Sequence, residues 1–185
     1  MSTSPRISVV IPVYNCADYL EAAVRSILNQ SVTDFELIAV NDGSTDSSDV
    51  VLDALASEDP RIVVHHQKNA GITHALNTGL ALARGSYIAR MDGDDIAWPE
   101  RFAKQINLLE QREDLVAVGT QVRLIDPDGR ALKTLPVPCD HVAIDEILLK
   151  DQSFAICHPS AMIRTKALRD IGGYSDLYPS AEDID

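Results

Sequence analysis

Apolar and polar residues follow one another along this chain in a pattern that predicts strands and helices in turn. A continuous apolar, mostly β-branched run at 7–14 predicts a strand, and Leu20, Val24 and Ile27, which share one helical face, predict a helix over 17–30. Three more strand and helix pairs follow, at 35–40 with 46–59, 61–67 with 73–85, and 86–91 with 99–114. Strands that are apolar on both faces need cover on both faces. The predicted fold class is therefore α/β, a Rossmann-like and mostly parallel sheet with helices on both sides.

The pattern changes after residue 114. The sequence there predicts a hairpin from 115–126 and 131–138 around the turn "PDGR", a short helix at 141–150, and a further strand at 154–165. No repeat or linker separates the two parts, so residues 1–185 are interpreted as a single domain. In this interpretation, 1–114 form a nucleotide-binding half, and 115–185 form a mixed extension that shapes the pocket of a second substrate.

The charge balance is acidic, with 28 Asp and Glu against 16 Lys and Arg and a formal net charge of -12. This balance opposes nonspecific binding to nucleic acid or anionic lipid, so no nucleic-acid partner is expected. Apolar runs are no longer than a strand, and no transmembrane segment is expected. The N-terminus "MSTSPR" lacks an apolar signal core, which favours the cytoplasm and leaves open a peripheral position at the inner face of the membrane for the full-length protein.

Polar residues follow each of the first four predicted strands, in "PVYN", "NDGSTDSS", "HHQKNAGITHALN" and "MDGDD". Any one of these stretches is an ordinary turn. The carboxyl ends of parallel strands meet at one edge of the sheet, however, and ligands of such sheets bind there. Four polar ends at one edge therefore favour a binding site. Neither GxGxxG nor GxxxxGK[ST] occurs, which excludes a dinucleotide fingerprint and a phosphate loop.

The stretch "MDGDD" places Asp92, Asp94 and Asp95 within four positions. Carboxylates this close repel one another unless a positive charge lies between them. They are hard oxygen ligands suited to Mg²⁺ or Mn²⁺, and the cation would in turn hold a diphosphate. At the end of the second strand, Asp42 can accept a hydrogen bond from an imide or a ribose hydroxyl. The residues thus predict a divalent metal and a phosphorylated ligand.

Several motifs together resemble the family 2 glycosyltransferases of the glycosyltransferase A fold. The stretches that carry this resemblance are "ISVVIPVYNCADYLEAAVRSILNQS", "FELIAVNDGSTDSS", "KNAGITHALNTGLALARGSYIARMDGDDIAWPERF", the glycines at 172–173, and the terminal "AED". The resemblance implies an inverting enzyme that takes a sugar from a nucleotide-sugar donor, usually a UDP- or dTDP-sugar, with a divalent metal, Mn or Mg, at the aspartate motif. The implied acceptor is a glycan or a lipid-linked acceptor in polysaccharide or cell-envelope glycan synthesis.

The resemblance also implies a role for individual residues. The donor-binding positions it gives are Pro12, Tyr14 and Asn15 at the nucleoside, Asp42 at the base, Asn69 and Gly71 along the nucleotide, and Asp92 and Asp94 in the aspartate motif. By this match Asp94 binds the metal, and Asp92, which lies near the ribose or donor sugar, is the second candidate ligand. Arg90 either reaches the donor phosphates or is an exposed strand-edge arginine.

The same resemblance places the catalytic base in the pair Glu182 and Asp183, with Asp183 at the position usually given that role. The chain ends at Asp185, whereas the family continues into an acceptor-binding region. The expectation is therefore a catalytic domain that is incomplete on its acceptor side.

Rival interpretations remain open at this stage. A nucleotide-sugar-binding module that has lost catalysis would share the same motifs. A phosphatase of the haloacid dehalogenase type would explain "MDGDD", but it places its aspartates after the first strand. Trp98 either packs on the core, which is the commoner case, or stacks on an acceptor sugar. His158 is the histidine best placed to touch a donor phosphate or the acceptor, although a core-edge position is commoner.

Overall fold

The computed structural model describes residues 4–150 and 155–175. In chain order its elements are β1 (Ile7–Val13), α1 (Ala17–Leu28), β2 (Phe35–Asp42), α2 (Ser48–Glu58), β3 (Ile62–Gln67), α3 (Ile72–Leu82), β4 (Tyr87–Arg90), α4 (Arg101–Gln111), β5 (Ala117–Val118), β6 (Arg123–Ile125), β7 (Ala131–Thr134), α5 (His141–Leu148), the 3₁₀ turn η1 (His158–Ser160), β8 (Met162–Arg164) and α6 (Thr165–Asp170). No described helix combines the length and the apolar character that a membrane crossing requires.

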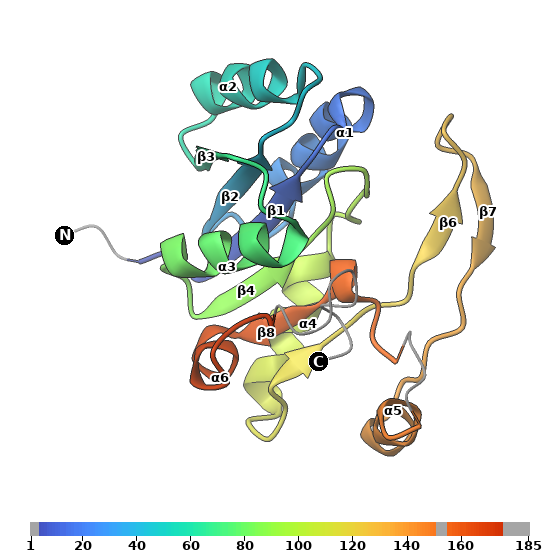
Figure 1. Cartoon of the computed structure of the whole chain (residues 1–185). Coiled ribbons are helices and arrows are strands. Elements are labelled where there is room, and N and C mark those ends of the chain that lie inside the picture. Colours follow the sequence, from blue (N-terminus) through green and yellow to red (C-terminus); the bar gives the residue numbers. More distant parts are fainter. Residues whose placement is uncertain (1–3, 151–154, 176–185) are drawn as a thin grey trace.

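The main sheet has the strand order β3-β2-β1-β4-β8-β5 (Figure 1). The first four strands in that order are parallel to one another, and β8 runs antiparallel to both β4 and β5. The predicted mixed, mostly parallel sheet is therefore confirmed. Because β1 lies between β2 and β4, the carboxyl ends of these three strands meet at the middle of one sheet edge.

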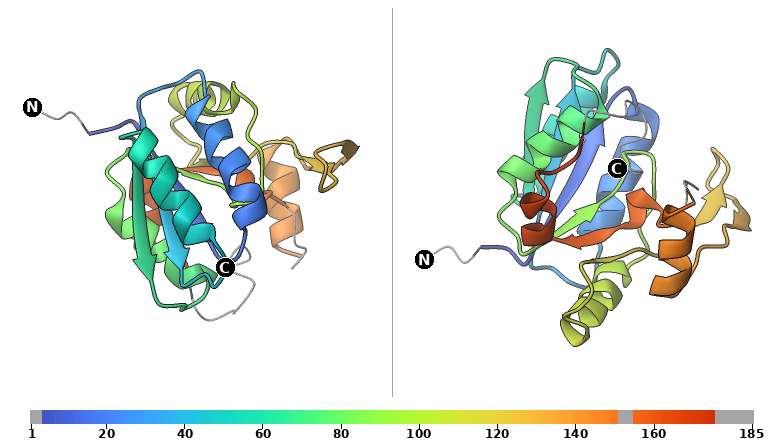
Figure 2. Two further views of the ribbon diagram at one scale, coloured as in Figure 1. Left: turned by 90° about the horizontal axis from the view of Figure 1, so that it is seen from above. Right: turned by 60° about the horizontal axis from the view of Figure 1, so that its bottom comes forward.

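Alternate residues of the central strands face two separate cores. On one side, Ile7, Val9 and Ile11 pack with α1, α2 and α4, whereas Val10 packs with α3 and α6 on the other side. The views in Figure 2 show helices on both faces of the sheet. The fit between α3 and β1 is close, since a Cβ on Gly79 would come within 2.4 Å of Val10 Cγ1. Because α3 directly follows the parallel strand β3, its N-terminus lies at the carboxyl ends of the strands.

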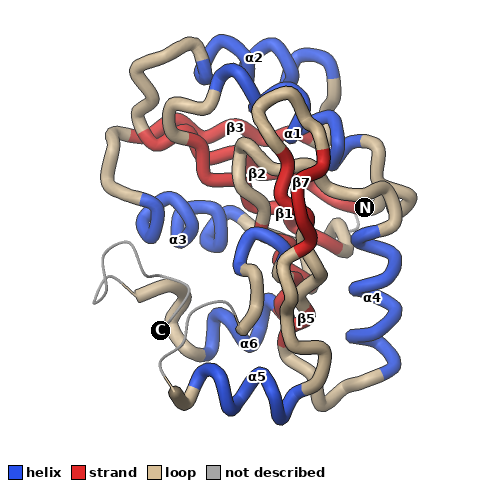
Figure 3. Tube along the Cα trace, turned by 90° about the vertical axis from the view of Figure 1, so that its right-hand side faces the viewer, coloured by secondary structure: helices blue, strands red, loops and turns tan. Residues whose placement is uncertain are grey.

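The prediction of one long hairpin over 115–138 is wrong in part. Residues Ala117–Val118 join the main sheet against β8, and only β6 and β7 form the hairpin. Figure 3 views the molecule from the side on which this hairpin lies. The separation occurs at Gly119 and Thr120. A Cβ on Gly119 would lie 2.8 Å from Ile156 Cγ2, and Thr120 N donates to Ser160 Oγ at 3.0 Å, so tertiary contacts hold the chain there.

Two other predicted boundaries also differ from the structure. The strand expected over 154–165 is limited to β8, because the chain at Pro159 forms the 3₁₀ turn, in which Ser160 Oγ donates to Cys157 O at 2.8 Å. The helix expected to begin at Pro99 begins at Arg101. Helix α6 was not expected at all.

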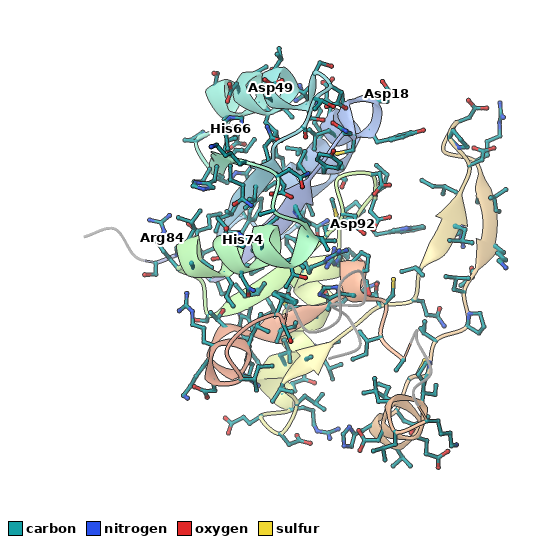
Figure 4. The ribbon with its side chains drawn as sticks, viewed as in Figure 1. Asp18, Asp49, His66, His74, Arg84 and Asp92 are labelled. Atoms are coloured by element: carbon teal, nitrogen blue, oxygen red, sulfur yellow. The ribbon has the colours of Figure 1, made fainter. Side chains whose placement is uncertain are left out.

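A polar cluster joins the strands at the end of the sheet opposite to these carboxyl ends. Glu36 is 4% exposed, and its carboxylate accepts from Ser8 Oγ at 2.6 Å and from the backbone N and the Nε of Arg84, each at 2.8 Å. In Figure 4, Arg84 lies to the left of α3 and Asp92 to its right. Burial opposes ionisation of Glu36, yet the hydrogen bonds from Arg84 and Ser8 prevail and lower its pKa.

Candidate active site

A cleft of about 510 Å³ lies at the carboxyl ends of β1, β2 and β4. Its lining consists of Pro12, Val13, Tyr14, Cys16, Asp42, Asn69, Gly71, Ile72, Ala75, Asp92, Gly93 and Asp94. The loops after the parallel strands thus meet as the polar strand ends predict. Of the predicted donor-binding residues, Asn15 and Arg90 are absent from this lining.

Asp42 lines the cleft and accepts hydrogen bonds from the loop that precedes α3. Its side chain is buried, and Oδ1 accepts from Gln67 Nε2 at 2.7 Å and from Ala70 N at 2.9 Å, while Oδ2 accepts from Gly71 N at 2.8 Å. Gly71 has a φ of +93° and precedes the first residue of α3. The carboxylate therefore fixes the loop that carries Asn69 and Gly71 and satisfies backbone donors ahead of the helix.

Asn15 connects two loops beside the cleft. It has a φ of 52°, which asparagine tolerates better than most residues. Its Oδ1 accepts from Thr45 N at 2.7 Å and Asp46 N at 3.3 Å, and its own backbone N donates to Ser44 Oγ at 3.1 Å. In this structure the side chain holds the β1–α1 loop against the β2–α2 loop.

Arg90 is buried rather than exposed at a strand edge, with a relative exposure of 2%. Its Nη1 lies 2.7 Å from Asp92 Oδ2 in an ion pair, although the two groups are not aligned as a hydrogen bond. The backbone O of Arg90 accepts from Arg101 Nη2 at 2.6 Å. Burial, more than any other influence, lowers the pKa of Arg101 to about 10, which leaves this side chain charged at neutral pH. Two buried guanidinium groups therefore lie beneath the acidic loop.

The acidic loop after β4, in which Figure 4 labels Asp92, holds three aspartates within four positions. Partial burial in the loop, and then repulsion from Asp92 and Asp94, raise the pKa of Asp95 to about 6, although part of its side chain reaches solvent. A divalent cation between these carboxylates would remove the repulsion, so the charge distribution fits such an ion.

The described residues do not supply a complete metal cage. In 4–150 and 155–175, no three His, Cys, Asp or Glu side chains come together in a way that could hold a metal ion. Asp92 and Asp94 can supply two carboxylates. Mg²⁺ commonly binds one or two protein carboxylates together with phosphate oxygens and water, so this donor set suits an ion that arrives with a diphosphate.

Cys16 is a lining residue that the sequence did not single out. Burial first, and then the charges of Asp94 and Asp46, raise the pKa of its thiol to about 11, so the thiol is neutral and a poor nucleophile. A Cβ on Gly93 would lie 2.7 Å from Cys16 Sγ. The glycine between the two aspartates of the motif is therefore the residue that allows the acidic loop to pack against α1. Gly93 was therefore the residue in the sequence from which the approach of this loop to Cys16 could have been predicted.

His158 is not among the residues that line the cleft. His158 is 9% exposed, its ring centroid lies 5.4 Å from that of Tyr174, and burial, followed by the charge of Arg90, lowers its pKa to about 3. It is therefore a neutral, core-edge histidine. The predicted base pair, Glu182 and Asp183, lies outside the described residues.

Comparison with known proteins identifies a family for almost the whole chain. The family model for Glycosyl transferase family 2 matches residues 8–172. The putative glycosyltransferase EpsE of Bacillus subtilis is 34% identical over 193 residues, which cover 100% of this chain and 66% of EpsE. The chondroitin synthase of Escherichia coli is 35% identical over 186 residues, covering 98% of this chain and 26% of that protein. The chain thus spans less than two thirds of these relatives.

Solved structures share the fold. Staphylococcus aureus TarS 1-349 in complex with UDP superposes with a TM-score of 0.75 at 20% identity, covering 97% of this chain and 53% of that one. The mannosyltransferase PcManGT from Pyrobaculum calidifontis, in complex with GDP-Man and Mn²⁺, gives a TM-score of 0.70 at 22% identity and covers 99% of this chain and 51% of that one. At these identities the likeness establishes the fold, which is of the glycosyltransferase A type.

Proposed function

Because this chain belongs to glycosyl transferase family 2, we propose that it binds a nucleotide diphosphate sugar in the cleft and transfers the sugar, with inversion, to an acceptor hydroxyl. The observation that carries the proposal is that Asp42, Asp92 and Asp94 line one cleft. Its volume of about 510 Å³ suits a ligand of this size, since ligand pockets span about 300–1,000 Å³. The family match also argues against the phosphatase, whose aspartates follow the first strand rather than β4.

The nucleoside end of the donor is assigned to Asp42 and its neighbours. An ionised carboxylate has about four acceptor sites, and three are occupied by Gln67, Ala70 and Gly71. One site remains for an imide N–H or a ribose hydroxyl. Tyr14, which is 53% exposed at the cleft, offers its ring to the base. UDP and dTDP donors both present the required imide.

The diphosphate end is assigned to Asp92 and Asp94, which would hold a Mn²⁺ or Mg²⁺ ion. That ion would stabilise the negative charge that grows on the departing nucleoside diphosphate. Arg90 pairs with Asp92 from below and fixes its carboxylate, and it adds positive charge beneath the phosphate position. In the PcManGT structure the bound ligands are GDP-Man and Mn²⁺, which supports a donor and a metal that arrive together.

The transfer itself needs a base on the face of the sugar opposite to the diphosphate. We assign this role to Asp183, with Glu182 before it in the sequence, because the terminal "AED" resembles the family's motif, although the family model itself matches only residues 8–172. The bond between the anomeric carbon and the phosphate oxygen breaks as the acceptor oxygen bonds to that carbon, and the acceptor proton passes to Asp183. Relatives such as the chondroitin synthase support a glycan acceptor in polysaccharide or cell-envelope synthesis.

Calorimetric titration of UDP, dTDP and GDP, each with and without Mn²⁺, tests the donor site. We expect one nucleotide to bind only with the metal, and Asp94→Asn to abolish that binding. The matched control is Asp128→Asn in the exposed hairpin turn, which should bind as the wild type does. If no nucleotide binds, the assignment of the cleft as a donor site is wrong. If a nucleotide binds but donor hydrolysis with metal is absent, the chain is a nucleotide-sugar-binding module instead.

A further inference from the structure

Trp98 lies at the surface, which is unusual for so large an apolar side chain. Its relative exposure is 71%, and it is not part of the cleft lining. The prediction that it packs on the core is therefore wrong. A single exposed apolar side chain is common on protein surfaces, so the neighbours of this one decide what it can bind. The donor cleft leaves this residue unexplained.

The backbone holds Trp98 in a fixed position next to the acidic loop. Its carbonyl accepts from Gln30 Nε2 at 2.7 Å and from Arg101 N at 3.0 Å. One residue earlier, Ala97 N donates to Ser26 Oγ at 3.0 Å. Since Asp94 lies only four positions before it, the indole is held close to the place where transfer would occur.

Arg123 on β6 completes the arrangement. Its guanidinium carbon lies 6.0 Å from the centroid of the Trp98 ring, at the outer limit of a cation–π contact, so the ring is not tightly covered. Every residue of β6 and β7 is exposed, and the hairpin stands apart from the main sheet (Figure 1). Across the part of the chain that the structure describes, the Arg123 guanidinium makes no ion pair or hydrogen bond. Its five N–H donors are free for a ligand.

From these observations we propose that Trp98 and Arg123 form an acceptor subsite that binds one sugar ring of a carbohydrate chain. A pyranose has a face of C–H groups and a rim of oxygen atoms. The indole matches the apolar face, and the guanidinium donates to the oxygens of the rim, whether hydroxyl or carboxylate. The subsite lies outside the donor cleft and beside its metal-binding end. This inference rests on the proposed transferase function, because it identifies the second substrate as a carbohydrate.

The chain has a single tryptophan, so its fluorescence reports on this position directly. We would titrate chitotetraose, a neutral probe, and a hyaluronan tetrasaccharide, an acidic probe, into the nucleotide-free protein. We expect a saturable change in emission. Saturation by the neutral probe assigns Arg123 to hydroxyl groups, and saturation by the acidic probe alone assigns it to a carboxylate. No saturable change with either probe overturns the proposal, because every pyranose offers a C–H face to the ring.

Substitutions then separate this subsite from the donor cleft. Arg123→Ala should weaken oligosaccharide binding about tenfold, as truncation of a central Arg commonly does, whereas Arg130→Ala in the same hairpin should leave it unchanged. Trp98→Ala should keep the UDP affinity of the wild type and raise the apparent KM for the oligosaccharide, with partial recovery in Trp98→Phe. Loss of UDP affinity in Trp98→Ala would refute an acceptor role. Failure of the wild type to bind UDP, dTDP and GDP alike would refute the transferase function, while the fluorescence titration would still report on the sugar.

Discussion

The cluster around Glu36 allows a sharp test of what holds the strands together at the end opposite to the cleft. Glu36→Gln keeps the shape of the side chain but removes its charge. One carboxylate oxygen accepts from Ser8 and from the backbone of Arg84, and an amide oxygen can replace it there. The other oxygen accepts from the Arg84 guanidinium, where an amide NH₂ would face another donor. The substitution therefore removes charge-assisted hydrogen bonds and places two sets of N–H donors opposite each other.

The expected cost follows from these contacts. Each hydrogen bond to a charged group contributes about 1.5–3 kcal/mol. The side chain of Arg84 is 59% exposed and can be rehydrated, which lowers the loss. We therefore expect Glu36→Gln to lower the free energy of unfolding by about 2 kcal/mol, or the melting temperature by about 4–8 °C for a chain of this size. The matched control is Glu58→Gln, which removes an exposed pair with Arg25 and should change stability by less than about 0.5 kcal/mol.

The pH dependence gives a second readout. The folded state lowers the pKa of Glu36 below its ordinary value of 4.5, so the ionised form stabilises the fold. This contribution is fully present above that ordinary value and is lost as the pH falls through the folded pKa. The stability of wild type and Glu36→Gln, measured by urea unfolding at about pH 7 and about pH 3.5, should thus differ by an amount that becomes smaller on acidification. A difference of the same size at both pH values, or no larger than that of Glu58→Gln, would refute the reasoning.

Three other predictions concern the cleft. Gly93→Ala should destabilise the fold by about 1–3 kcal/mol, since its Cβ would meet Cys16 Sγ at 2.7 Å. The double variant with Cys16→Ala should recover most of that loss, and thermal unfolding of the two single variants and the double variant measures this recovery. Asp42→Asn should lower the free energy of unfolding by about 2 kcal/mol, because one buried backbone N–H loses its acceptor oxygen. Calorimetry should also show weaker nucleotide binding by this variant, and an unchanged affinity would exclude a role for Asp42 in the donor site. The Cys16 thiol, with a pKa of about 11, should react with a maleimide far more slowly at neutral pH than the exposed Cys139. Mass spectrometry of the labelled peptides measures the two rates, and equal rates would contradict the burial of Cys16.

The sequence by itself determined the parallel strands of the sheet and the sheet edge at which the cleft lies. Apolar runs of strand length, alternating with helical periodicity, are local signals, and they predicted the first four strands and helices within a few residues. Turn-forming residues such as Asp42 and Asp94 stand at the end of those strands or shortly after it. In a parallel sheet their positions must meet at one edge, so the cleft could be predicted without any knowledge of distant contacts.

Tertiary structure decided the environment of individual side chains. Arg90 is buried at the point where its backbone N donates to Ala161 O, more than seventy residues later in the chain, next to the pairing of β8 with β4. Cys16 belongs to the cleft because Gly93 allows a separate loop to approach its sulfur. Trp98 is exposed, and the guanidinium nearest to its ring belongs to Arg123, in a hairpin that stands away from the core. Burial and pairing of this kind depend on segments that are remote in sequence, and periodicity carries no information about them.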